Sequence, residues 1–157
     1  MELSPNVITF FSRQGFVIVS TFDPKGYIHC SAKGLVDINQ AGRLHIIDLY
    51  LANTFNNIKN NPIVSITAVD EHEFTGYTLK GKAKIVEKDK IDEAIIQKWK
   101  EKVVSRASTR VIKNIRRDKS SPTHPESRFP EFKYLIEVEA EEIVDLSPAH
   151  LKRPASS

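Results

Sequence analysis

Apolar and polar residues alternate along most of this chain, and the alternation divides it into short strands. A strand with one buried face carries an apolar side chain at every second position. Residues 63–69 alternate apolar with small polar side chains, and residues 132–143 alternate apolar with charged ones. Runs rich in valine, isoleucine, phenylalanine and threonine favour strands as well. The predicted strands are 16–22, 27–36, 44–50, 63–69, 75–87 and 132–143.

Two shorter segments predict helices instead. Residues 4–15 begin with Ser-Pro, which suits an N-cap and a first turn, and they close on a glycine that can end the helix. A second helix starts at Asn53 and Thr54, both residue types that favour the N-cap. It stops at Asn60-Asn61-Pro62, because asparagine tolerates the left-handed conformation of many helix ends and the residue before proline resists the helical one.

A third helix is predicted from residue 89 to about residue 116. Its apolar residues recur every four positions and form one continuous stripe. Residues 105–109 are a weak stretch, so a break into two helices is an open alternative. Residues 119–130 are polar and hold three prolines, which indicates a surface loop.

The order of these elements predicts a small barrel. Asp23 to Gly26 has the composition of a tight turn, and Gly76 and Gly81 lie inside a strand pattern, where glycine often marks a bulge or a close backbone approach. Long alternation of strands and helices is absent, which argues against a doubly wound sheet. We therefore expect a mainly β fold, a six-stranded antiparallel barrel with helices packed outside it.

Composition and charge narrow the class further. The chain has 157 residues, enough for one domain, which we place at 1–146 with a tail at 147–157. A net charge of +3 is too small to indicate nucleic acid by itself. Cys30 is the only cysteine, and no signal-like segment or apolar run of about 20 residues is present. These features predict a cytoplasmic protein without a membrane span.

The start of the short helix is the candidate functional site. A helix start leaves backbone N–H donors without partners and carries a partial positive charge. Lys33 ends an earlier strand and adds a full positive charge. A phosphate held between Lys33, Thr54 and this helix N-terminus is the main hypothesis.

Four segments in order give the chain a resemblance to a known family. They are GFVIVST at 15–21, GYIHCSAKG at 26–34, NTFNNIKNNP at 53–62 and GKAKIV at 81–86. Each motif is weak alone, but their order and spacing are similar to those of the FMN-binding split β-barrel family, whose best-known member is pyridoxamine 5′-phosphate oxidase. The resemblance runs from about residue 7 to residue 146.

The resemblance implies a homodimer with two FMN molecules between the subunits. It implies that Lys33, Asn53 and Thr54 hold the flavin phosphate, with Asn57 one turn further on. The segments that would contact the flavin ring or its other side are Ser31 and Ala32, then Ile47, Asp48 and Leu49, and, from the partner subunit, Gly76 and Tyr77.

The departures from the family pattern bear on the activity. The oxidase has a basic pair where this chain has Asn53 and Thr54, and its arginine-bearing C-terminal signature is missing here. The chain looks closer to the general stress or flavin reductase-like group. An FMN-dependent oxidoreductase with a small-molecule donor and acceptor is expected, and a flavin, deazaflavin or haem binding or storage module is the alternative. No catalytic side chain and no metal-ligand spacing is identified.

Residues 98–119 hold nine basic and two acidic residues. A solvated helix face is the simpler interpretation, and a landing site for an anionic partner is the other. The acidic segment 137–145 offers a third possibility, since it could pair with this helix across the fold.

Overall fold

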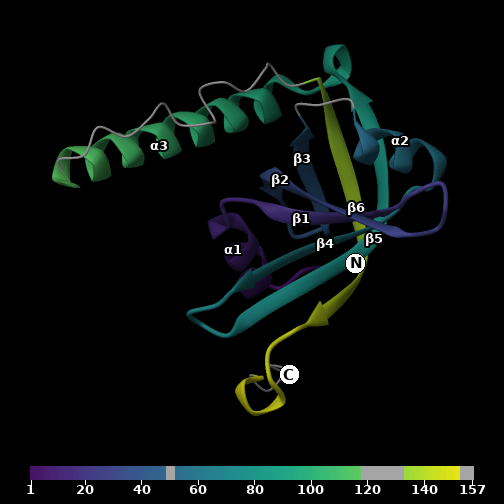
Figure 1. Ribbon diagram of the computed structural model, residues 1–157, viewed down its shortest axis with the longest axis horizontal. Coiled ribbons are helices and arrows are strands. Elements are labelled where there is room, and N and C mark those ends of the chain that lie inside the picture. Colours follow the sequence, from purple (N-terminus) through teal and green to yellow (C-terminus); the bar gives the residue numbers. More distant parts are fainter. Residues whose placement is uncertain (49–51, 118–132, 153–157) are drawn as a thin grey trace.

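The computed structural model describes the backbone of residues 1–48, 52–117 and 133–152, and the side chains of these residues apart from 106–117. Six antiparallel strands close into a barrel in the order β1-β2-β3-β6-β5-β4 (Figure 1). This confirms the predicted fold class. The strands are β1 (Val17–Phe22), β2 (Ile28–Ile38), β3 (Arg43–Asp48), β4 (Ile63–Asp70), β5 (Thr75–Glu87) and β6 (Tyr134–Asp145).

The strand order shows how the barrel closes. β1, β2 and β3 pair as consecutive neighbours, as do β4 and β5. β1 also pairs with β4, and β6 fills the remaining gap between β3 and β5. A closed barrel leaves no strand edge unpaired.

The core follows from the predicted alternation. Every second side chain along the strands points inward, and most of these inward side chains are buried. Two helices cover the barrel ends. α1 (Pro5–Arg13) buries Val7 and Phe11 and packs Phe10 against Tyr77 near the start of β5. α2 (Asn53–Asn60) packs on the other end. The largest fully buried side chains are Leu3, Phe11, Val17, Val19, Leu35, Leu44, Ile46, Val64, Ile66, Leu79, Tyr134 and Ile136.

α3 (Glu93–Arg117) follows a short 3-10 turn, η1 (Lys88–Lys90), and packs its first turns on the outside of the barrel. Its Ile95, Ile96 and Trp99 cover a small second apolar cluster formed by Val36, Ile47, Ile91 and Leu135. The helix then extends away from the barrel (Figure 1). It is continuous, so the alternative of two helices is wrong. No helix in the described part of the chain is both long and apolar enough to cross a membrane.

One turn and one bulge form as expected. Gly26 has φ +84°, and the Asp23 carboxylate accepts the N–H groups of Lys25 and Tyr27, which confirms the tight turn. The strand register shifts between Lys80 and Gly81, where a Cβ would lie 2.0 Å from the carbonyl oxygen of Glu139. Only glycine fits this bulge.

Two helix ends differ from expectation. α1 ends at Arg13 with an extended Gln14, so Gly15 does not terminate it. Asn61 after α2 is extended rather than left-handed, because the following proline disfavours the helical region. A last 3-10 turn, η3 (Ala149–Leu151), follows β6. The predicted strand end at 49–50 and the loop at 119–130 lie outside the described residues.

Candidate functional site

A buried ion pair lies at the α2 end of the barrel. Lys33 Nζ is 2.7 Å from Asp48 Oδ2, and the two side chains are 11% and 2% exposed. The hydroxyl of Tyr134 donates a hydrogen bond to the same carboxylate oxygen. The strand register brings the three together, because Asp48 pairs with Tyr134 and the neighbouring pair Gly34 and Ile47 sets Lys33 opposite Asp48.

Burial decides the protonation state of Tyr134. Burial, the hydrogen bond to Asp48 and the negative charge of that carboxylate all raise the pKa of Tyr134 well above its usual range. The phenol therefore stays a hydrogen-bond donor. Phe55 of α2 packs its ring against Tyr134 with centroids 4.8 Å apart, which ties this helix to the cluster. A buried carboxylate needs such partners, since an uncompensated buried charge is strongly destabilising.

Two hydroxyl groups meet beside this pair. Ser31 Oγ of β2 lies 2.9 Å from Thr54 Oγ1 in the first turn of α2. The prediction that Asn53 or Thr54 caps this helix is wrong: the N-cap residue is Ala52, and no side chain caps the helix. The Thr54 side chain is turned inward and buried, so its oxygen reaches Ser31 instead.

The other two α2 residues of the predicted site lie differently. Asn57 is buried and its amide donates to Thr21 Oγ1 at 3.0 Å, which fastens α2 to β1. Asn53 is exposed at the start of the helix. Ser31, Lys33, Asp48 and Thr54 thus gather at the start of α2, with Asn53 at the surface beside them.

Four of the remaining predicted residues lie within the described part of the chain, and these four do not join the group within one chain. Ala32 points to the opposite, exposed face of β2, and Ile47 is buried in the cluster beneath α3. Leu49 lies outside the described residues. Tyr77 packs its ring edge on Phe10, with centroids 5.1 Å apart.

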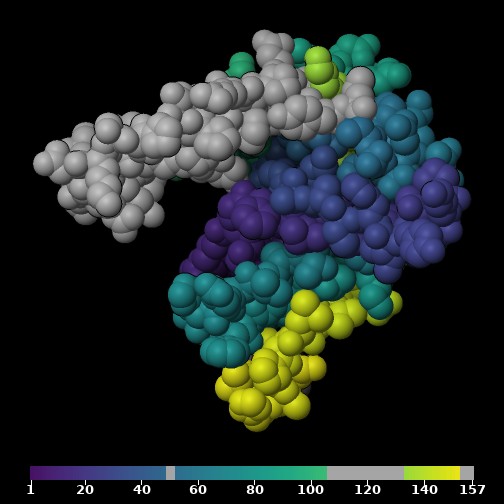
Figure 2. Space-filling model, in the orientation of Figure 1, coloured from purple at the N-terminus to yellow at the C-terminus, as the bar shows by residue number. Residues whose placement is uncertain are grey.

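Gly76 lines a groove at the far end of the barrel. Val69, Phe74, Leu146 and Pro148 are among its walls, and its volume is about 600 Å³. In Figure 2 the teal surface of the β4–β5 hairpin and the yellow C-terminal segment lie side by side there. A Cβ on Gly76 would lie 2.9 Å from Val69 Cγ1, so close packing inside the chain already explains this glycine.

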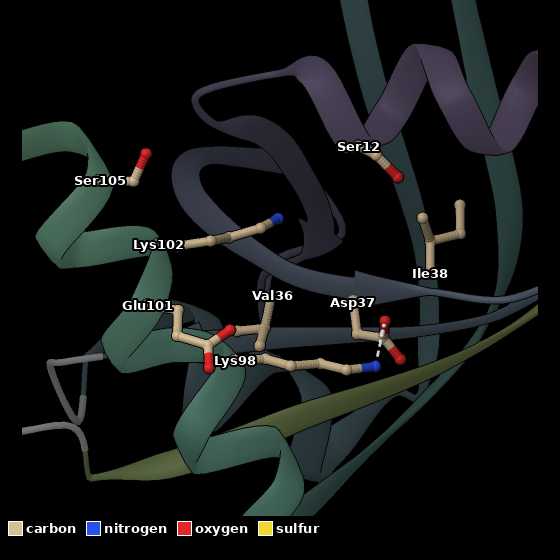
Figure 3. A pocket seen from close by; sticks show the side chains of 8 residues that line it. All are labelled: Ser12, Val36, Asp37, Ile38, Lys98, Glu101, Lys102 and Ser105. Carbon is tan, nitrogen blue, oxygen red and sulfur yellow. Dashed lines mark hydrogen bonds and ion pairs between the residues drawn. The ribbon is translucent and has the colours of Figure 1, made fainter. Parts of the chain in front are cut away.

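A further cavity of about 350 Å³ lies between α1, β2 and α3 (Figure 3). Its two lysines are engaged. Lys98 Nζ is 2.8 Å from Asp37 Oδ1, and Lys102 donates to the carbonyl oxygen of Leu35 at 2.8 Å. These contacts hold α3 on the barrel. Nothing in this cavity matches the predicted phosphate site.

Ionisable side chains form a row across the outer face of four strands. Asp37, His45, Glu137 and Lys84 stand on adjacent strands, with His45 Nδ1 3.6 Å from Asp37 and Nε2 3.3 Å from Glu137. Lys84 lies 2.7 Å from Glu137. Burial acts to raise the pKa of Glu137, but hydrogen bonds from Lys84 and His45 and the charges of Lys84 and Arg43 lower it below its usual value.

The acidic face of β6 pairs with β5 rather than with the basic helix. Lys80 binds Glu142 at 2.8 Å and Lys82 approaches Glu141 at 3.4 Å, alongside the Lys84–Glu137 pair of the row. The expected pairing with α3 is therefore not the arrangement seen among the described residues. β5 and β6 are direct neighbours in the sheet, so their outward side chains meet first.

Sequence reasoning missed the role of Tyr134. The alternation along the last strand placed it with Ile136 and Val138 as a core residue. A buried tyrosine needs a hydrogen-bond partner for its hydroxyl. This requirement is the signal in the sequence from which a buried acceptor such as Asp48 could have been inferred.

Comparison with known proteins now adds to this geometry. Residues 3–143 match the family model described as pyridoxamine 5′-phosphate oxidase. The chain belongs to the pyridoxamine 5′-phosphate oxidase family. The match spans the whole barrel, from α1 to β6.

Solved structures share the fold of this pyridoxamine 5′-phosphate oxidase family member. HupZ of Group A Streptococcus is 18% identical with a TM-score of 0.64, covering 92% of this chain and 95% of that chain. HutZ, the heme storage protein from Vibrio cholerae, is 24% identical with a TM-score of 0.54, covering 92% and 94%.

A Clostridium acetobutylicum protein related to general stress protein 26 is 15% identical with a TM-score of 0.54, covering 94% of each chain. At these identities the likeness establishes the fold alone. A comparison with curated protein sequences finds no match.

Proposed function

We propose that this protein binds FMN at the α2 end of the barrel and passes electrons through it between a small donor, such as a reduced nicotinamide, and a small acceptor. One observation carries the proposal. The Ser31 hydroxyl meets Thr54 at the start of α2, and Lys33 lies two residues further along the same face of β2; the family resemblance assigns the flavin phosphate to Lys33 and Thr54 and the flavin ring to Ser31.

The residues present fit a phosphate. The first turn of α2 has no capping side chain, so its backbone N–H groups are available as donors. The Ser31 and Thr54 hydroxyls, 2.9 Å apart, share one hydrogen bond, which leaves one hydroxyl proton of the pair to donate, and Lys33 supplies an ammonium group. Bound FMN would supply the redox chemistry, while these side chains would anchor and orient it. No side chain is assigned as acid or base.

A homodimer is part of the proposal, and the outer sheet face supports it. Nine outward-pointing residues on three adjacent strands form a block without any charge. Ile28 is 70%, Ile63 50% and Phe22 37% exposed in the isolated chain. Contiguous exposed apolar surface of this kind marks protein interfaces. The block consists of Ile28, Cys30 and Ala32 of β2, Ile18, Ser20 and Phe22 of β1, and Ile63, Ser65 and Thr67 of β4.

The dimer is tested by sedimentation of Ile28→Glu. A charge in the middle of an apolar interface is expected to yield a monomer with an unchanged circular dichroism spectrum. Leu151→Glu is the matched control, because Leu151 is 48% exposed but lies in η3, away from the block. Equal sedimentation of the wild type and Ile28→Glu would show that this face is not the interface.

The cofactor is tested by the visible spectrum of the purified protein. A yellow protein that releases FMN on denaturation is expected, and NADH or NADPH should bleach it anaerobically. A colourless protein that cannot be reconstituted with FMN contradicts the proposal. Lys33→Ala and Thr54→Val should weaken FMN binding more than riboflavin binding, since only FMN carries the phosphate. A cytoplasmic location belongs to the same proposal, supported by the free thiol of Cys30.

A second candidate is a non-catalytic binding module for flavin, deazaflavin or haem. The observation that favours it is the pairing of Lys33 with Asp48, which leaves this lysine without excess charge for a phosphate. The 24% identity to a heme storage protein is consistent with it. This candidate is favoured if FMN binds but is not reduced at catalytic rates by NADH, NADPH or donors kept reduced with dithionite. It is also favoured if the protein retains added haemin in preference to FMN.

A further inference from the structure

The Lys33–Asp48 pair decides how much charge the α2 end offers a ligand. A lysine facing a phosphate attracts it, but the Asp48 carboxylate stands 2.7 Å from the same ammonium group and competes with the phosphate for it. With both groups ionised the pair carries no net charge. A dianion therefore gains little from Lys33 beyond its hydrogen bonds, while an uncharged ligand loses nothing.

We infer that Asp48 is a specificity-determining residue of this site: acting through Lys33, it lowers the preference for a phosphorylated ligand over the same ligand without its phosphate. This inference rests on the proposed function. Asp48 is 1% exposed on the inner face of the barrel, so it is a positioning residue rather than a ligand-contacting one.

Tyr134 holds Asp48 in this role. Its hydroxyl donates to Oδ2, the oxygen that also faces Lys33. Sharing this oxygen moderates the hold of the carboxylate on the ammonium group. Loss of the hydroxyl in Tyr134→Phe removes a donor that shares this oxygen with Lys33, so the lysine is bound more tightly and the phosphate preference falls.

The experiment compares two ligands on one protein. Apoprotein is titrated with FMN and with riboflavin, and the measured quantity is Kd for riboflavin divided by Kd for FMN. Asp48→Asn is expected to raise this ratio about tenfold to a hundredfold, because Lys33 is then no longer paired with a carboxylate and can direct its ammonium group to the phosphate. Riboflavin binding reports whether the variant still folds.

Asp37→Asn is the matched control. Asp37 also forms an ion pair with a lysine, because Lys98 Nζ lies 2.8 Å from Asp37 Oδ1. Its substitution changes the net charge by the same amount as Asp48→Asn. It stands four residues along β2 from Lys33, about 13 Å, so screening should keep its ratio within about twofold of the wild type. A rise equal to that of Asp48→Asn would mean that overall charge, not this pair, sets the preference.

A double-mutant cycle tests the route through Lys33. In a Lys33→Gln background, Asp48→Asn should no longer raise the ratio. A full rise there overturns the inference, as does an unchanged ratio in the single variant. If Asp48→Asn does not fold, Tyr134→Phe decides: a lowered ratio supports the inference and an unchanged or raised one overturns it.

The two proposals fail differently in this experiment. Wild-type protein that binds neither flavin overturns the proposed function and this inference together. Wild-type protein that binds both flavins, with a ratio that Asp48→Asn leaves unchanged, overturns the inference alone.

Discussion

Replacing one member of the Lys33–Asp48 pair is expected to destabilise the protein far more than replacing both. At 2.7 Å, an effective dielectric constant of about 20 gives an attraction of about 6 kcal/mol. Removing two ions from water costs several kcal/mol for each, so the net contribution of the pair is small. Breaking it is different, because the surviving charge stays buried without its partner.

These magnitudes give three variants with distinct outcomes. Asp48→Asn strands an ammonium group that is 11% exposed and should lower the free energy of unfolding by about 3–5 kcal/mol. Lys33→Met should lower it by about 3 kcal/mol, the lower end of that range, since Tyr134 still donates to Asp48. The double variant Lys33→Met/Asp48→Leu should stay within about 1 kcal/mol of the wild type.

Urea unfolding followed by fluorescence of Trp99, the one tryptophan, measures these differences. Trp99 packs on the Gly34 position of β2, so its emission reports separation of α3 from the barrel. Glu141→Gln is the control, because the Lys82–Glu141 pair is more than half exposed and should matter by less than about 1 kcal/mol. A double variant that loses as much as the two single variants combined would refute the reasoning.

Three further predictions concern other positions. Gly81→Ala places a Cβ 2.0 Å from a backbone oxygen and should lower the free energy of unfolding by about 3 kcal/mol or more. Gly15→Ala is the control and should change it little, because a Cβ there meets nothing within 4 Å. Equal unfolding midpoints for the two variants would contradict this prediction. Because burial raises the pKa of Tyr134, stability should fall as the pH rises above about 10. By absorbance, the native protein should show as many phenolates as Tyr134→Phe and one fewer than the unfolded wild type. Lys84, His45 and Arg43 lower the pKa of Glu137, so ionised Glu137 stabilises the folded state above about pH 4.5, and this contribution is lost as the pH falls through the lowered pKa. In Glu137→Gln, the free energy of unfolding should therefore depend less on pH in the acid range.

Periodicity carried the prediction of the fold. The segment 75–87 was expected as a strand with a glycine irregularity, and β5 has those bounds with a bulge at Gly81. Single-residue features at element ends depended on tertiary contacts instead. Thr54 is a residue type that favours the N-cap, but its side chain instead forms a hydrogen bond with the hydroxyl of Ser31, which is distant along the chain.

Only part of the arrangement at the candidate site follows from the sequence, because the rest depends on tertiary contacts. Lys33 and Thr54 were singled out as residue types that suit an anion, and the fold brings both to the start of α2. The partner of Lys33 follows from the register of three strands, which no local pattern reveals. Asp48, which the resemblance places beside the flavin, lies on the inner face of β3 with its carboxylate 2.7 Å from Lys33.

The position of β6 has a consequence for how the chain is made. Among the strands in the described residues, β6 is the last to leave the ribosome, yet it pairs along its length with β5 and also pairs with β3. Until residues 134–145 emerge, a nascent chain presents two open hydrogen-bonding edges, and Asp48 lacks the phenol that holds it. Premature termination before this strand should therefore yield chains that recruit chaperones or aggregate, because the edges of β3 and β5 stay unpaired and the barrel cannot close without β6.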